Sequence, residues 1–425
     1  MSNKWYKVDN AGKIFPTIWT LKERKSFRLS AVLKEEVDPA ILQLALDAAL
    51  QRFSAFGVRL KRGLFWYYLE SNPNKALVSE ERNIYCEINP YRGKRHLFSL
   101  CYYGHRISLD IFHTLTDGNG GMEFFKCILY YYLQMLGGIF ENKGEIMTQD
   151  LEKYNDETSD SFLKNYDKNI EKTKKEDKGY KIKGTPYGDG RLGIIQAISS
   201  VSEFKNVAKK YNATITEYIS ACLLQAVYQH GFNGKNQDQV FNLNVPVNVR
   251  KFFESNTLRN FALFIRTQSR FNNNASFEDI IEHTKTVFKE QLTKEKLQQR
   301  IIQNVKIEKN IFVRILPLFI KKPVMKIGYK VLGSSIDTLC FSNLGMLKLP
   351  NGFENYIDRM EFVIPSSSDS PVNASAVSYN DKLTLSFSTF ILERKIIKNI
   401  IDQFVKDGIN ILIETNDLEV RDENM

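Results

Sequence analysis

A charged stretch that is poor in apolar residues divides this 425-residue chain near its middle. Between about residues 149 and 193 the sequence is rich in charged residues and poor in apolar ones, a composition typical of an exposed crossover or linker. The chain shows no repeat of fixed period, which argues against solenoids and propellers. We therefore predict two domains, residues 1–190 and residues 191–425.

Both halves carry the same mixture of strand and helix signals. Asp38 can cap the start of a helix, and Pro39 after it has the fixed φ angle that suits a first helical turn. Thr214 and Glu217 form a capping box at the start of another helix. The fold class is therefore α/β of the α+β type, with mixed sheets flanked by helices. The predicted strands are residues 27–33, two within 56–68, 97–103, 107–112, 239–249, 261–270, 338–341, 374–379 and 383–390. The other predicted helices include residues 122–136, 277–305 and 393–413.

Composition and charge narrow the class of protein. Hydrophobic residues make up 43% and charged residues 25% of the chain, so it can bury a large core. The net charge of +10 fits a polyanion, a membrane surface or an anionic cofactor without choosing among them. Five scattered cysteines lack a CxxC pair, which favours a reduced compartment. With no signal peptide and no apolar run of about 18 residues, we expect a cytoplasmic protein.

The strongest local motif is HTLTDG, residues 113–118, which lies where a predicted strand ends and a predicted helix is about to begin. The imidazole of His113 is largely neutral near pH 7, so it can accept a proton from an alcohol or an amine. Asp117 is placed to cap the following helix and to pair with an arginine, so we expect its role to be architectural. Gly118 and the glycines after it permit a tight backbone turn.

Spacing alone leaves two interpretations of this motif. A buried, hydrogen-bonded His113 beside an ordinary helix cap explains the spacing about as well as a general base does. The arginine partner of Asp117 stays open among Arg52, Arg59 and Arg250. The HxxxD spacing supplies too few ligands for a metal ion, and no phosphate-binding loop of the GxxxxGK[ST] type occurs, so we expect no metal site.

The sequence around the motif, SLDIFHTLTDGNGGMEFFKCILYYYL, resembles the active-site segment of the CoA-dependent acyltransferase superfamily. This superfamily includes chloramphenicol acetyltransferase, the condensation domains of peptide synthetases and alcohol acetyltransferases. Further segments resemble the bacterial alcohol acetyltransferase branch, in this order along the chain: WYKVDNAGKIFP, RFSAFGVRLKRGLFWYYLE, NVPVNVRKFFESNTLRNFALFIRT, FSNLGMLKLP and NASAVSYNDKLTLSFS.

The resemblance implies two pseudo-symmetric lobes with an active-site tunnel between them. It also implies that His113 deprotonates an acceptor hydroxyl, which attacks the thioester of acetyl-CoA or another acyl-CoA directly, with no permanently bound cofactor. Ser342, Asn343 and Asn260 lie in segments that resemble the donor side of the tunnel, so they are candidates to stabilise the oxyanion. Many relatives carry a second histidine before the catalytic one, where this chain has Phe112.

Two rival functions stay open beside a CoA-dependent O-acyltransferase. A condensation-type enzyme would take its acyl group from an acyl carrier protein, and a catalytically silent relative would hold a lipid or a membrane. The basic charge comes without a nucleic-acid motif, so we expect no nucleic acid as a partner.

Residues 300–330 carry eight basic residues and one acidic residue, which fits a CoA-phosphate, carrier or peripheral membrane surface. We favour the alternative that the apolar residues of this segment are core and its lysines their solvated rim. These apolar residues are Phe312, Ile315, Leu316 and Phe319.

Overall fold

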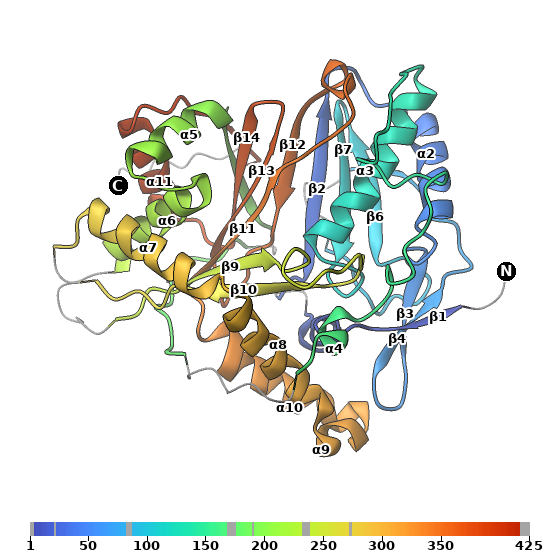
Figure 1. Cartoon of the computed structure of the whole chain (residues 1–425), viewed down its shortest axis with the longest axis horizontal. Coiled ribbons are helices and arrows are strands. Elements are labelled where there is room, and N and C mark those ends of the chain that lie inside the picture. Colours follow the sequence, from blue (N-terminus) through green and yellow to red (C-terminus); the bar gives the residue numbers. More distant parts are fainter. Residues whose placement is uncertain are drawn as a thin grey trace.

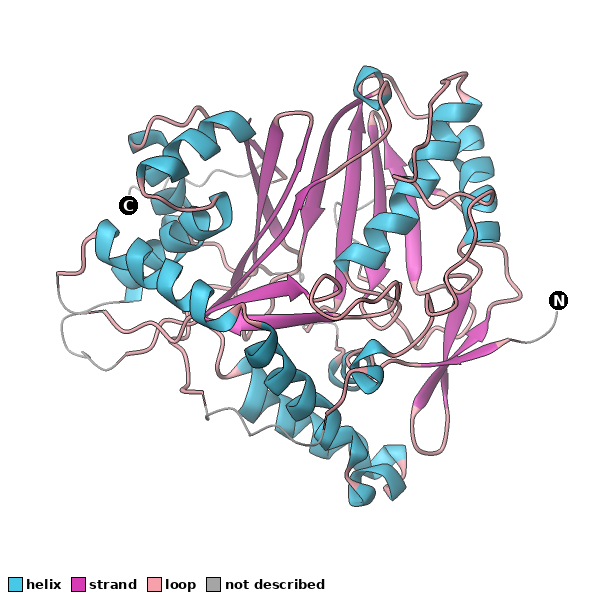
Figure 2. Cartoon of the chain, viewed as in Figure 1, coloured by secondary structure: helices cyan, strands magenta, loops and turns pink. Residues whose placement is uncertain are grey.

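Three β-sheets form the framework of the computed structural model (Figures 1 and 2), and the predicted α+β class with mixed sheets is confirmed. The structure describes residues 4–20, 23–81, 87–167, 176–188, 191–231, 239–271 and 274–416. The seven-stranded sheet has the order β10 (Ala262–Arg266), β9 (Leu243–Asn248), β11 (Leu339–Met346), β13 (Val372–Tyr379), β14 (Lys382–Thr389), β8 (Gly193–Ser200), β15 (Leu412–Thr415). The five-stranded sheet has the order β12 (Ile357–Val363), β2 (Ser26–Leu33), β7 (Arg106–Phe112), β6 (Phe98–Tyr103), β5 (Ser79–Glu80). The third sheet has the order β1 (Trp5–Lys7), β4 (Tyr67–Ser71), β3 (Val58–Arg62).

Strand β12 belongs to the second half of the sequence but pairs antiparallel with β2 of the first half. In Figure 1 it stands between β13 and β2, where the two large sheets meet. Its charged side chains are held by ion pairs, with Arg359 bonded to Glu361 at 3.1 Å and to Glu414 at 2.6 Å. The two halves of the chain therefore share one sheet, while their division at residue 190 stays a prediction.

Helices cover one face of each large sheet (Figure 1). Helices α2 (Pro39–Arg52) and α3 (Gly118–Met135) build the first core against β2, β6 and β7. Helices α5 (Val201–Lys210), α6 (Ile215–Gly231), α7 (Phe277–Gln291) and α11 (Lys395–Lys406) build the second core. The predicted caps are confirmed: Asp38 accepts hydrogen bonds from Ala40 and Ile41, and Thr214 exchanges hydrogen bonds with Glu217.

Two predicted helices have wrong boundaries. The helix predicted over residues 277–305 is two helices, α7 and α8 (Lys294–Lys309), because Thr293 caps the second one through Lys296 N. The helix predicted over residues 393–413 ends at Lys406, and Gly408 then adopts a φ of 89°. The chain reverses there, and the four residues of β15 pair with β8 to complete a sheet edge.

Three of the four apolar residues that the sequence predicts to be core in the basic segment are exposed and the fourth, Leu316, is partly buried, so that prediction is wrong for this group. The buried apolar residues of the segment are others: Ile301, Ile302, Val305 and Leu318. Phe312 is 72% exposed, Ile315 57% and Phe319 63%. They lie on α9 (Ile311–Ile315) and α10 (Leu318–Tyr329), which extend beyond the sheets at the lower edge of Figure 1. No described helix is long and apolar enough to cross a membrane.

Candidate active site

The HTLTDG loop follows β7 directly and is fixed at each of its polar residues. His113 N donates to Lys25 O at 3.0 Å, Thr114 Oγ1 to Gly12 O at 3.2 Å, and Thr116 Oγ1 to Leu258 O at 2.5 Å. Two of these partners belong to the N-terminal 25 residues and the third, Leu258, lies far away in the sequence. The loop is therefore held between the N-terminal segment and the segment that precedes β10.

Asp117 connects this loop to the second half of the chain. Its carboxylate caps α3 by accepting from Gly120 N at 3.0 Å, and it also accepts from Phe261 N at 2.8 Å. Arg250 donates to its two oxygens at 2.9 and 3.1 Å. Of the three arginines left open by the sequence, Arg250 is thus the partner, because Arg52 pairs with Glu157 and Arg59 with Glu70.

Glycines make the close approach around this loop possible. A Cβ atom on Gly120 would lie 2.1 Å from Thr116 Oγ1 and 2.3 Å from Leu258 O, so only glycine fits there. A Cβ atom on Gly118 would lie 2.9 Å from Leu344 Cδ2. Strand β11 therefore reaches the first residue of α3 from the other half of the chain.

The imidazole of His113 has one engaged nitrogen. Nδ1 lies 2.9 Å from Asn260 Oδ1, while Asn260 Nδ2 donates to Asp9 Oδ2 at 3.0 Å and to His113 O at 3.0 Å. Because both amide protons of Asn260 are used in this way, its oxygen faces Nδ1 as an acceptor and Nδ1 carries the proton. Nε2 then has a free lone pair, and no residue in the described ranges hydrogen-bonds to it.

The surroundings of His113 favour its neutral form. Burial lowers the pKa of His113 below its ordinary value, and the charge of Lys25 acts in the same direction, whereas Asp117 and Asn260 oppose it. Phe15 stacks on the ring with a centroid distance of 4.3 Å, and Phe27 meets it edge-on at 5.3 Å. At pH 7 the ring is therefore available as a base.

The three candidate oxyanion donors lie in different settings. Asn260 adjoins His113, but both of its N–H groups are engaged. Ser342 and Asn343 lie on β11, where Asn343 Nδ2 donates to Thr216 Oγ1 at 3.0 Å and Oδ1 accepts from Gly345 N at 2.8 Å. Within the described residues, neither of the two is hydrogen-bonded to His113. Phe112, at the position of the second histidine of many relatives, is fully buried in the first core.

Two residues beside His113 were not predicted from the sequence as part of the site. Asp9 accepts from Gly12 N at 2.7 Å and from Asn260, and burial raises the pKa of Asp9 to about 6. Phe15 stacks on the imidazole from α1 (Ile14–Ile18). An aspartate followed three residues later by glycine is a turn signal, so Asp9 could have been placed in a tight turn, although not beside His113.

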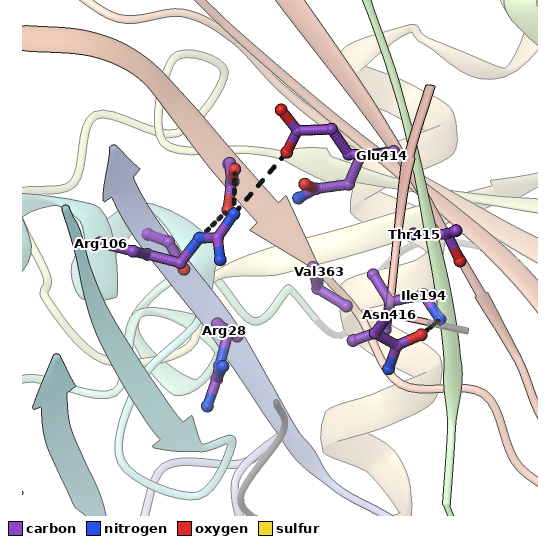
Figure 3. A pocket seen from close by; sticks show the side chains of 10 residues that line it. Arg28, Arg106, Ile194, Val363, Glu414, Thr415 and Asn416 are labelled. Atoms are coloured by element: carbon purple, nitrogen blue, oxygen red, sulfur yellow. Dashed lines mark hydrogen bonds and ion pairs between the residues drawn. The ribbon is translucent and has the colours of Figure 1, made fainter. Parts of the chain in front are cut away.

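A cavity of about 350 Å³ lies in the gap between the two large sheets (Figure 3). Strands β2, β7 and β12 line one side and residues of β8 and β15 the other. Its two arginines have carboxylate partners: Arg28 pairs with Asp110 at 2.8 Å and Arg106 with Glu361 at 3.0 Å. His113 is not among its lining residues, so this cavity is separate from the candidate catalytic group.

The chain offers no other obvious reactive group in the part that the structure describes. No set of three or more His, Cys, Asp or Glu residues there is grouped to hold a metal ion. Burial raises the pKa of the Cys127 thiol to about 12 and also raises those of Cys222 and Cys340, as expected for thiols in apolar surroundings. Cys86 lies outside the described residues.

Comparison with known proteins identifies the fold. By sequence, the chain matches no protein-family model and no curated protein. By structure, it is similar to polyketide synthase associated protein 5 from Mycobacterium tuberculosis, with a TM-score of 0.63 and 12% identity over 94% of this chain and 96% of that one. TRI101 of F. sporotrichioides, complexed with coenzyme A and T-2, has a TM-score of 0.61 and 10% identity over 97% and 99% of the two chains. TRI3 trichothecene 15-O-acetyltransferase from Fusarium sporotrichioides has a TM-score of 0.60 and 11% identity over 95% of this chain and 94% of that one.

The first condensation domain of the CDA synthetase and the condensation domain of the Monacolin K polyketide synthase are also among the matches. The predicted fold, which acetyltransferases and condensation domains share, is therefore confirmed for this chain.

The Asp117 site predicts a measurable difference between two helix caps. Asp117→Ala removes a cap, the Phe261 contact and the partner of a largely buried Arg250, so the free energy of unfolding should fall by about 3 to 5 kcal/mol. Asp38→Ala removes only the cap of α2 and should cost about 1 kcal/mol. Urea unfolding followed by tryptophan fluorescence measures both. Equal losses in the two variants would contradict the role given to Arg250.

Proposed function

We propose that this protein is a CoA-dependent acyltransferase that moves an acyl group, acetyl in the first instance, from acyl-CoA to an alcohol hydroxyl. The observation that carries the proposal is the fixed, neutral imidazole of His113, with Nδ1 bonded to Asn260 and Nε2 free. The fold supports it, since the chain is similar to an O-acetyltransferase and to a protein complexed with coenzyme A. An amine acceptor would use the same chemistry.

In the proposed reaction His113 acts as a general base and then as a general acid. Nε2 takes the proton of the acceptor hydroxyl while the hydroxyl oxygen attacks the thioester carbonyl. When the tetrahedral intermediate collapses, the C–S bond breaks and the imidazolium returns the proton to the CoA thiolate. The products are an ester and CoA–SH, so atoms and charge balance without an acyl-enzyme.

Asn260 and Asp9 act as positioning residues in this scheme. The Asn260 oxygen selects the tautomer with the proton on Nδ1, and the Asp9 carboxylate holds the amide in that orientation. This role replaces the oxyanion role that the sequence suggested for Asn260, because both of its N–H groups already have acceptors. Ser342 and Asn343 keep the oxyanion role as candidates, since β11 reaches Gly118 through the adjacent Leu344.

The central prediction concerns His113 itself. His113→Ala should lower acceptor-dependent CoA release by about 10² to 10⁴-fold, because the variant has no base at the reacting hydroxyl. His105→Ala is the matched control, since His105 lies at the exposed turn at the other end of the same hairpin, and it should retain full activity. The assay follows free CoA by chromatography with acetyl-CoA and longer acyl-CoAs against a panel of alcohols and amines.

The same assay separates the rival functions. The proposal would be overturned if no pair of acyl donor and acceptor gave CoA release, or if wild type and His113→Ala released CoA equally. Transfer only from an acyl carrier protein would instead identify a condensation-type enzyme, the activity of several proteins that share this fold.

The direction of the His113 pKa predicts the acid limb of the pH profile. Because the base must be neutral and burial lowers the pKa of His113 from its ordinary value of 6.5, the half-maximal point of the acid limb of kcat/KM should lie below pH 6.5. Asp9, with a pKa of about 6, titrates in the same pH range. The pH profile of the residual activity of His113→Ala is therefore measured in parallel, as the control for a contribution from Asp9. A half-maximal point above pH 7 would contradict the burial of the imidazole.

The positioning role of Asn260 predicts a shift that an oxyanion donor would not cause. Asn260→Ala removes a hydrogen bond that raises the His113 pKa, so the acid limb should move to lower pH while kcat falls by up to about a hundredfold. KM for acyl-CoA should change little. Asn343→Ala, if Asn343 stabilises the oxyanion, should lower kcat without moving the limb. An unmoved limb in Asn260→Ala would contradict the assignment.

A further inference from the structure

The end of α8 together with α9 and α10 presents large apolar side chains to solvent. Nine such residues between positions 307 and 331 are 42–72% exposed, and α9 has no buried residue. In Figure 1 these helices extend below the sheets, with α9 at the far end. We call this the 307–331 surface; its exposed apolar residues are Ile307, Ile311, Phe312, Ile315, Phe319, Ile320, Val324, Ile327 and Val331.

Helix α10 is oriented with its apolar stripe outward. Ile320, Val324 and Ile327, followed by Val331, recur at the spacing of one helical face, and all are exposed. Lys321, about 90° around the helix from this stripe, faces the protein instead: it is 1% exposed, donates to Phe65 O at 2.9 Å and lies 3.5 Å from the centroid of the Trp66 ring. A helix that buries a lysine and exposes its apolar stripe is the reverse of an ordinary surface helix, so the outward face is built for contact.

The turn between β3 and β4 extends this surface. Leu64 is 67% and Phe65 43% exposed, and Leu64 O accepts from Leu318 N at 2.8 Å at the start of α10. Arg62 in the same hairpin is exposed as well. A segment more than 200 residues away in sequence thus adds apolar and basic side chains beside α10.

The charges around the 307–331 surface are of one sign. Lys306, Lys309, Arg314, Lys326 and Lys330 are exposed, and Lys322 is partly exposed. The only acidic residue from 306 to 331 is Glu308, and it forms an ion pair with Lys13. Protein interfaces are depleted of lysine, whereas helices that lie on anionic membranes combine Phe, Leu or Ile on one face with Lys and Arg around it.

We propose that the 307–331 surface docks this protein on an anionic membrane, with the apolar stripe in the lipid interface and the basic rim on the headgroups. The surface protrudes instead of forming a groove, which suits a flat bilayer better than a folded protein partner. Each lysine contacting an anionic surface strengthens binding about fivefold, so the rim contributes substantially beside the apolar burial.

The docking surface adjoins the candidate active site. Helix α10 packs on α1, whose Phe15 stacks on His113. Tyr329 at the end of α10 lies 5.5 Å from Lys25 Nζ, and Lys25 O accepts the His113 amide. If the proposed function holds, docking brings His113 close to the lipid, and we infer that the preferred acceptors are alcohols dissolved in the membrane.

Vesicle sedimentation with the full chain tests the docking. We expect at least tenfold stronger binding to phosphatidylcholine vesicles that contain 30% phosphatidylglycerol than to phosphatidylcholine alone, and weaker binding as salt rises. Phe312→Ser with Phe319→Ser should reduce binding at least tenfold, and Lys326→Ala with Lys330→Ala about fivefold for each lysine. Ile139→Ser, at a residue that is 97% exposed after α3, is the matched control and should bind like wild type.

Several outcomes would overturn the docking proposal. One is that the protein does not bind anionic vesicles, and another is that Phe312→Ser with Phe319→Ser binds them as well as wild type does. A third is that the surface mediates only a dimer or only the binding of a carrier protein, which sedimentation without lipid would show. Circular dichroism confirms that each variant is folded. Vesicle binding requires no activity, so it stands if no acyl transfer is found. The acceptor inference is tested by comparing wild type with Phe312→Ser and Phe319→Ser combined. We expect wild type to acylate a long-chain alcohol carried in vesicles faster than the variant does, and the two proteins to acylate a water-soluble alcohol equally fast.

Discussion

The bidentate ion pair between Asp117 and Arg250 is the interaction on which the candidate site depends. One carboxylate caps α3, holds the amide of Phe261 and pairs with an arginine from the other half of the chain. Because Arg250 also donates to Thr257 O at 2.9 Å and Arg259 O at 2.7 Å, the pair fixes the segment that carries Asn260. The orientation of the His113 ring follows from that, since Asn260 reaches Nδ1 only from this segment.

Local sequence signals were sufficient for the elements whose causes are local. Asp38 with Pro39 and Thr214 with Glu217 start helices through contacts within four residues, and the hairpin of β6 and β7 follows from alternation around Gly104. Strand β12 escaped prediction because its Arg359 and Glu361 are buried through ion pairs that only the fold supplies. Strand β15 was not predicted either. Its four residues follow a helix closely and form a strand only because β8 offers them an edge to pair with.

The site divides in the same way. His113, Asp117 and Gly118 form one short motif, so they were visible in the sequence. Asn260 lies 147 residues from His113 and Arg250 lies 133 residues from Asp117, so their pairing depends on how the two halves of the chain meet. The sequence likewise indicated an apolar face in the basic segment 300–330, but it cannot show whether another layer covers that face. In this fold none of the described layers does.

The proposed function requires that the fold holds His113 as a neutral base with its proton on Nδ1. Nitrogen-15 NMR of the labelled protein tests this directly, with the signals of His113 identified among the five histidines by their loss in His113→Ala. We expect, at pH 7, a protonated Nδ1 and an unprotonated Nε2, with the tautomer preference weakened in Asn260→Ala. A proton on Nε2, or a doubly protonated ring at pH 7, would contradict it.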